Sequence, residues 1–195
     1  MKYEVPHDES EILPNKLGLK NLEEIAVSEF EGFLQAEIIL TESLHIRTKF
    51  NTKYILKIHK LALAHLYAFA GKYRNVNISK GSFLFSSARF LTESMKQFEN
   101  EILLKLPSDY KSRETLIRDV AMVHGELLFI HPFREGNGRT ARILANLMVR
   151  KAGFNPLEFE KIKGKTFEQY IIAVQSSAAK NYEPMVDLIG KILPS

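Results

Sequence analysis

The chain has 195 residues, of which 45% are hydrophobic and 26% charged, and it contains no cysteine. This length fits one globular domain with a substantial hydrophobic core. The absence of cysteine excludes a disulfide scaffold, thiol catalysis and any zinc site built on cysteine. The net charge of +4 is spread along the sequence. A protein that binds nucleic acid normally carries a concentrated basic face, so we expect no nucleic-acid partner.

Neither the first residues nor the most apolar stretch is typical of a secreted or membrane protein. The first ten residues lack the apolar centre of a signal peptide. The longest uncharged apolar stretch, residues 61–71, is about half as long as a membrane-spanning helix. We therefore expect a cytoplasmic protein without a membrane partner.

Apolar residues recur at helical spacing along most of the chain. Residues 1–19 are polar and predict an irregular N-terminal arm, whereas residues 20–195 predict a single all-α domain. Asn51 is a good helix N-cap, and Thr166-x-x-Gln169 fits a capping box. We predict helices over residues 21–38, 51–71, 92–106, 112–127, 139–152 and 183–193, and one that opens at Thr166.

One segment alternates like a β-strand instead. Residues 76–79 and 82–85 alternate polar and apolar side chains, and Lys80-Gly81 fits a turn between them. We predict a short β-hairpin whose edge docks an extended peptide of a target protein. Ile78 and Phe83 would hold that peptide, unless they pack on the core instead. The docking residues are predicted to be Val76, Asn77, Ile78, Ser79, Lys80, Gly81, Ser82 and Phe83.

Residues 131–142, His-Pro-Phe-Arg-Glu-Gly-Asn-Gly-Arg-Thr-Ala-Arg, hold the densest group of chemically useful side chains. The loop Gly136-Asn137-Gly138 leads into the predicted helix over 139–152. Backbone N–H groups and the positive end of a helix favour an anion such as a phosphate at this point. Arg139 and Arg142 are three residues apart, so they flank the same anion.

Two further residues of this segment indicate the chemistry. Glu135 offers a hard oxygen ligand for Mg²⁺ on phosphates, and His131 can accept a proton near neutral pH. The combination predicts phosphoryl or nucleotidyl transfer. A purely structural interpretation is weaker, because two arginines at a helix start oppose the helix dipole unless an anion is bound.

Two other motifs are less well supported. The spacing Gly136-x-Gly138-x-x-Ala141 matches a dinucleotide-binding fingerprint, with Glu158 downstream, but no parallel strands are predicted around it. His124, His131 and Glu135 do not have the spacing of a known zinc-binding motif.

Every defined position of H-x-F-x-[DE]-G-N-G-R-x-x-R is filled in residues 131–142, and on this segment the chain resembles the Fic (Fic/Doc) family. Residues 67–74 are similar to a second family segment, with Phe69 where the family has Trp. Residues 76–85 resemble the family's flap. The resemblance covers roughly residues 15–193 and implies an all-α, Fic-type helical bundle with one short β-hairpin.

Such proteins typically transfer AMP from ATP to a hydroxyl group of a target protein. The resemblance implies that His131 deprotonates a Ser, Thr or Tyr of the target. It also implies that Glu135 holds Mg²⁺ on the α- and β-phosphates of ATP. Its phosphate-binding residues here are Gly136, Asn137 and Gly138 at the α-phosphate, Arg139 at the β-phosphate and Arg142 at the γ-phosphate.

Gly138 favours adenylyl transfer over phosphorylation. Relatives that phosphorylate carry Lys at this position, whereas glycine lets the backbone approach a phosphate closely. The leading hypothesis is thus a protein adenylyltransferase, such as a bacterial toxin or a cell-division regulator. A phosphotransferase, another nucleotidyltransferase and a catalytically silent ATP-binding module are the alternatives.

Regulation is the feature on which the sequence departs from many relatives. Their inhibitory helix reads [ST]-x-x-x-E-[GN], and its glutamate pairs with the second motif arginine. Residues 27–32 match at Glu31-Gly32 but have Val27 in place of Ser or Thr, so an ordinary amphipathic helix is the better interpretation. Inhibition by Glu31, inhibition by a separate small antitoxin, and homo-oligomer formation are left open.

Overall fold

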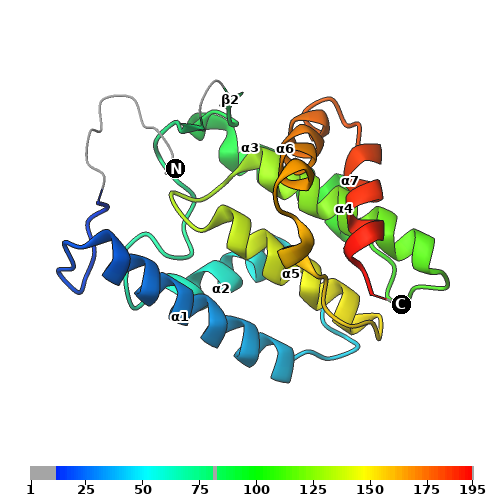
Figure 1. The fold of residues 1–195 in the computed structure, drawn as a ribbon, viewed down its shortest axis with the longest axis horizontal. Coiled ribbons are helices and arrows are strands. Elements are labelled where there is room, and N and C mark those ends of the chain that lie inside the picture. Colours follow the sequence, from blue (N-terminus) through cyan, green and yellow to red (C-terminus); the bar gives the residue numbers. More distant parts are fainter. Residues whose placement is uncertain (1–11, 81–82, 195) are drawn as a thin grey trace.

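The computed structural model describes residues 12–80 and 83–194, and it is mostly helical with one β-hairpin (Figure 1). The described part also contains three short 3-10 segments, Ala88–Phe90, Leu103–Lys105 and Phe159–Lys161. Its α-helices are α1 (Leu22–Glu42), α2 (Thr52–Leu63), α3 (Leu91–Glu101), α4 (Arg113–Ile130), α5 (Asn137–Lys151), α6 (Lys165–Ser177) and α7 (Glu183–Ile192). The prediction of a helical bundle with one hairpin is confirmed.

Helices α4 and α5 form the centre of the bundle. They pack against each other, α1 and α2 cover α5, and α6 and α7 cover α4 (Figure 1). Leu116, Val120, Leu144 and Leu147 are completely buried there, with no more than 1% of each side chain exposed. None of the described helices is long and apolar enough to cross a membrane.

Several predicted helix boundaries differ from those of the structure. The second helix ends at Leu63 rather than near Gly71, and turns follow it. Its apparent apolar continuation is an aromatic stack, in which the rings of Tyr67 and Phe69 lie 4.6 Å apart. The third α-helix ends at Glu101, before a 3-10 turn. Thr166 lies inside α6, since Gly164 is the N-cap, with a φ of 56° that suits glycine.

The fifth helix starts two residues earlier than predicted. Asn137 is its first residue and Gly136, with φ of 75°, is its N-cap. Asn137 and Gly138 therefore belong to the first helical turn and not to a loop before it. Their N–H groups are among those that lack acceptors within a helix. The positive end of α5 thus lies closer to His131 than the sequence suggested.

The hairpin differs from the prediction by one residue in register. Strand β1 is Ser79–Lys80 and strand β2 is Phe83–Leu84, and they pair antiparallel with Ser79 opposite Leu84 and Lys80 opposite Phe83. Lys80 is therefore a strand residue, and not a turn residue. The predicted docking residues Gly81 and Ser82 lie outside the described residues.

Candidate active site

The connection between α4 and α5 contains the motif, and two unusual backbone conformations shape it. His131 ends α4 in the left-handed region, with φ of 53° and ψ of 59°, and Gly136 begins α5 at φ of 75°. A histidine pays a steric cost for a positive φ, because its Cβ approaches the backbone. Such strain persists only where surrounding contacts hold the residue. His131 is held by contacts with Leu128, Arg74 and Phe85.

The imidazole of His131 is buried and has a defined tautomer. Its Nδ1 donates a hydrogen bond to the carbonyl oxygen of Leu128 at 2.6 Å. In the neutral ring, Nε2 then carries the lone pair that accepts a proton. Burial lowers the pKa of His131 to about 3, and the charges of Arg74 and Lys80 act in the same direction. The ring is thus neutral at physiological pH.

Two residues from the hairpin region hold His131 in place. The ring of Phe85 stacks on the imidazole at 3.8 Å. Arg74, which is only 5% exposed, donates to the carbonyl oxygens of His131 (2.8 Å) and Val76 (2.6 Å). One guanidinium therefore ties the end of α4 to the base of the hairpin. Nothing in the local sequence around His131 indicated Phe85 as a neighbour.

The loop after His131 is clamped from both ends. Asn137 accepts a hydrogen bond from Phe133 N and donates one to Phe133 O, both at 2.8 Å. His59 stacks on Phe133 with ring centres 3.8 Å apart, and its Nε2 donates to the Glu135 carbonyl oxygen at 3.0 Å. Burial lowers the pKa of His59 to about 4, which keeps it neutral. The side-chain amide of Asn137 thus fixes the loop.

Two carboxylates surround the first arginine of the motif. The Nη2 atom of Arg139 lies 2.6 Å from Glu29 and 3.5 Å from Glu135. Glu29 is 7% exposed, and its other oxygen accepts a hydrogen bond from the hydroxyl of Tyr67 at 2.6 Å. Arg139 also lies over the ring of Phe33, 4.6 Å from its centre. The guanidinium is therefore preoriented by α1 and the turn after α2.

Glu29 is a site residue that the sequence analysis missed. It lies on the buried face of α1 with Ile25, Gly32 and Phe33. A carboxylate among the apolar residues of a buried helix face indicates that a partner is present. Burying a charged group without a partner would cost several kcal/mol, to order of magnitude. Glu31, the candidate inhibitory glutamate, is exposed on the opposite side of α1.

The second arginine, Arg142, has different neighbours from Arg139. Its guanidinium is 5.3 Å from the centre of the Phe159 ring. Burial is the main cause of the lowered pKa of His124, and the positive charge of Arg142 lowers it further. Within the described part of the chain, Arg142 Nε is buried without a hydrogen-bond partner. A buried donor in this state is a place where an anion would be stabilised.

The hairpin residues divide into buried and exposed groups. Ile78 is only 2% exposed, which favours the alternative that it packs inside the protein over direct contact with a target peptide. Its neighbour Asn77 accepts a hydrogen bond from the N–H of Ala88 at 2.8 Å, which closes the base of the hairpin. Phe83 is half-buried against Phe85, with ring centres 5.1 Å apart. Leu84 is 76% exposed and is the apolar side chain that β2 presents to solvent.

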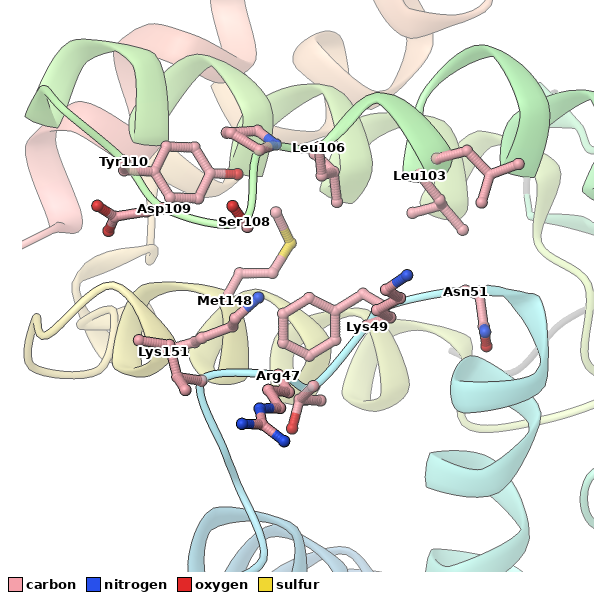
Figure 2. A pocket seen from close by; sticks show the side chains of 15 residues that line it. Arg47, Lys49, Asn51, Leu103, Leu106, Ser108, Asp109, Tyr110, Met148 and Lys151 are labelled. Atoms are coloured by element: carbon pink, nitrogen blue, oxygen red, sulfur yellow. The ribbon is translucent and has the colours of Figure 1, made fainter.

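A cavity of about 770 Å³ lies elsewhere, at the other end of α5. It is bounded by residues 46–51, by residues 103–104 and 106–110, and by Met148 and Lys151 (Figure 2). None of the residues 131–142 lines it. This cavity is therefore separate from the motif.

Comparison with known families decides the classification. The family model described as "Fic/DOC family" matches residues 49–149, which include α2 to α4, most of α5 and the whole motif. The chain belongs to the Fic/DOC family. The matched region therefore contains His131, Glu135 and both arginines in the arrangement described above.

Two relatives of known name match about three quarters of the chain. A protein adenylyltransferase Fic of Nematostella vectensis is 31% identical over 147 residues, which are 74% of this chain and 32% of that protein. One from Drosophila willistoni is 28% identical over 145 residues, 74% of this chain and 28% of that protein. The chain thus matches only about a third of the length of these relatives.

Solved Fic domains share the fold over nearly the whole chain. The N-terminal FIC domain of Bep8, a VirB-translocated effector of Bartonella sp. 1-1C, superposes with a TM-score of 0.79 at 20% identity, covering 96% of this chain and 93% of that one. BepC of Bartonella tribocorum, solved with bound AMPPNP, has a TM-score of 0.75 at 20% identity and covers 96% and 95%. These similarities confirm the Fic fold.

Proposed function

We propose that this chain is a protein adenylyltransferase that moves AMP from ATP to a Ser, Thr or Tyr hydroxyl of a target protein. The observation that carries the proposal is the junction of α4 and α5. There, a neutral histidine with a defined tautomer immediately precedes a helix start with two arginines. The relatives named protein adenylyltransferase, and the AMPPNP bound to BepC, support the choice of ATP.

The start of α5 would hold the triphosphate. The N–H groups of Asn137 and Gly138 and the positive helix end favour the α-phosphate, as at other anion-binding helix starts. Apart from Gly138 itself, its chain neighbours and the backbone of α5, no heavy atom of the described residues lies within 4 Å of the position that a Cβ of Gly138 would occupy, so a phosphate has room to approach the backbone. Arg139 would bind the β-phosphate and Arg142, with its buried Nε, the γ-phosphate.

His131 would act as the general base. Its Nε2 removes the proton of the target hydroxyl while that oxygen attacks the α-phosphorus. The bond from this phosphorus to the bridging oxygen of the β-phosphate breaks, and pyrophosphate leaves with the electron pair. The low pKa of the buried ring makes it a weak base in the free protein, but negative phosphates beside it raise the pKa of an imidazole. The protein otherwise contributes positioning and charge neutralisation.

Glu135 would hold Mg²⁺. In residues 12–80 and 83–194, no group of three or more His, Cys, Asp or Glu side chains could hold a metal on its own. This fits Mg²⁺, which proteins often bind through one or two carboxylates and the phosphates of a substrate. The ion would neutralise charge on the triphosphate. Glu135 Oε1 accepts a hydrogen bond from Gly136 N at 2.8 Å, which orients the carboxylate toward the start of α5.

The hairpin would dock the target. A short exposed strand can pair with an extended peptide through its main chain. The contact of Phe85 with His131 places the base of the hairpin beside the proposed base. Val76, Asn77 and Ile78 would support the hairpin from below, and the strand residues Ser79, Lys80 and Phe83 would align the peptide. The exposed side chain of Leu84, rather than the buried Ile78, would contact the side chains of the peptide.

Binding of ATP to the full chain tests the nucleotide site directly. Arg142→Gln should weaken ATP binding by about tenfold or more, because a charge-assisted hydrogen bond is worth about 1.5–3 kcal/mol. Arg118→Gln is the matched control, since Arg118 is an exposed arginine that pairs with Glu183 at 2.8 Å, outside the motif. Isothermal titration calorimetry with Mg²⁺ measures both. A wild-type chain that does not bind ATP, or an Arg142 variant that binds it equally well, would refute the site.

A further inference from the structure

The outer face of α1 is apolar and exposed to solvent. Figure 1 shows this helix at the periphery of the bundle. The exposed fractions of its outer apolar residues are 51% for Val27, 64% for Phe30, 49% for Leu34 and 48% for Ile38. Their spacing of three, four and four residues places them in one stripe along the helix. We refer to these four residues as the outer stripe.

The outer stripe is not part of the core. The buried face of α1 consists of Ile25, Glu29, Gly32, Phe33, Ala36 and Leu40. At about 100° per residue, the outer stripe lies nearly opposite this face. A helix in one bundle needs a single apolar face, and its other face is normally polar. A second, contiguous apolar face on a helix indicates a surface for another molecule.

The charged side chains of α1 itself are all negative. Helix α1 contains six glutamates and no lysine or arginine. Glu24, Glu31 and Glu42 are exposed along one edge of the stripe. An apolar stripe with this border is complementary to a helix that has apolar residues on one face and lysine or arginine beside them.

We infer that the outer stripe docks a cationic amphipathic helix of a partner protein. From Val27 to Ile38 the stripe is about 17 Å long, which corresponds to about three turns of such a helix. A second copy of this chain fits less well, because pairing α1 with α1 brings glutamates together. Residues 1–11 also fit less well, since they contain four carboxylates and a single lysine. The inference does not depend on the transfer reaction.

Two labelled peptides test the inference on the full chain. Each has about 18 residues with leucine at the a and d positions of a heptad repeat; one has lysine and the other glutamate at the e and g positions. Fluorescence anisotropy measures their binding. The lysine peptide should bind in the micromolar range and at least about tenfold more tightly than the glutamate peptide. Its affinity should fall with added salt.

Substitutions locate the binding surface. Phe30→Ser combined with Leu34→Ser should weaken binding of the lysine peptide by about tenfold or more. Ile172→Ser, on the exposed side of α6 at 57% exposure, is the matched control and should leave binding unchanged. Thermal unfolding of each variant confirms that the fold is retained.

Three results would overturn the inference. The first is that the lysine peptide shows no saturable binding at chain concentrations up to about 100 µM. Any binding would then be weaker than about 5 kcal/mol. The second is equal binding to the wild-type chain and to the Phe30/Leu34 variant. The third is a dimer of the wild-type chain, seen by light scattering at micromolar concentration, that the same variant abolishes; a second copy would then be the occupant.

Discussion

At the scale of single residues, His131 illustrates how distant parts of the chain define one side chain. Its ring nitrogen is bonded within α4, its face is covered by Phe85, and its backbone carbonyl is held by Arg74. These contacts fix both the tautomer and the strained backbone. Because the ring touches the proposed reaction through Nε2 alone, its removal should affect chemistry more than nucleotide binding.

We predict that His131→Ala lowers the rate of AMP transfer by about 10²- to 10⁴-fold, the usual contribution of a general base. Binding of ATP should stay within about twofold of wild type, because the phosphate contacts come from α5. Transfer kinetics and calorimetry on the same preparation separate the two effects. His45→Ala, an exposed histidine in the α1–α2 connection, is the control. A His131 variant that keeps near wild-type rates would rule out this residue as the base.

The motif residues could be predicted from the sequence because they lie within twelve consecutive positions. Spacing alone then brings a base, a carboxylate and two arginines to one helix start. Glu29 and Phe85 could not be found in this way. Glu29 reaches Arg139 across 110 positions, and Phe85 reaches His131 across 46. Such contacts depend on how the helices pack, which local periodicity does not encode.

At the scale of elements, the sequence predicted which segments are helical more reliably than where they end. Asn51 caps α2 as expected, and Ser112, where a helix was predicted to begin, caps α4; both side chains bond the backbone of the first turn. The predicted end of α2 was wrong because Leu66 and Phe69 continue the apolar spacing of the helix, although both lie in the turns that follow it. The hairpin register depends on its turn geometry, for which Lys80-Gly81 was an ambiguous signal.

The proposed role of the hairpin in docking the target can be tested by a substitution in β2. Leu84→Ser should lower the modification of a target protein several-fold and leave ATP affinity unchanged, because Leu84 faces solvent rather than α5. The fold should tolerate the change for the same reason. Leu104→Ser is the matched control, as Leu104 is 66% exposed in the distant 3-10 turn. Equal loss of ATP binding would instead assign the hairpin to the nucleotide site.

At the scale of the whole molecule, three buried histidines link stability to pH. Burial lowers the pKa from about 6.5 to about 4 for His59 and to about 3 for His124 and His131. In the unfolded chain these groups take up protons below about pH 6.5, whereas in the folded chain they do not. Unfolding is therefore favoured as the pH falls.

We predict that the free energy of unfolding falls between pH 6.5 and pH 5 by up to about 2 kcal/mol for each buried histidine. Well above pH 6.5 this contribution is constant, because these histidines are then neutral in both the folded and the unfolded state. Urea unfolding at several pH values measures the slope. His124→Gln should reduce the slope, and His45→Gln should not. A stability that is flat from pH 7 to pH 5 would show that the buried histidines do not stay neutral in the folded protein.

The most direct measurement follows the phosphorus atoms of ATP. The full chain is incubated with Mg²⁺, a cell extract as a source of acceptor proteins, and ATP labelled either at the α- or at the γ-phosphate. The account predicts that protein acquires the α-label and not the γ-label, and that His131→Ala and chelation of Mg²⁺ each abolish the transfer. Transfer of the γ-label, or no transfer of either label by a chain that binds ATP, would contradict it.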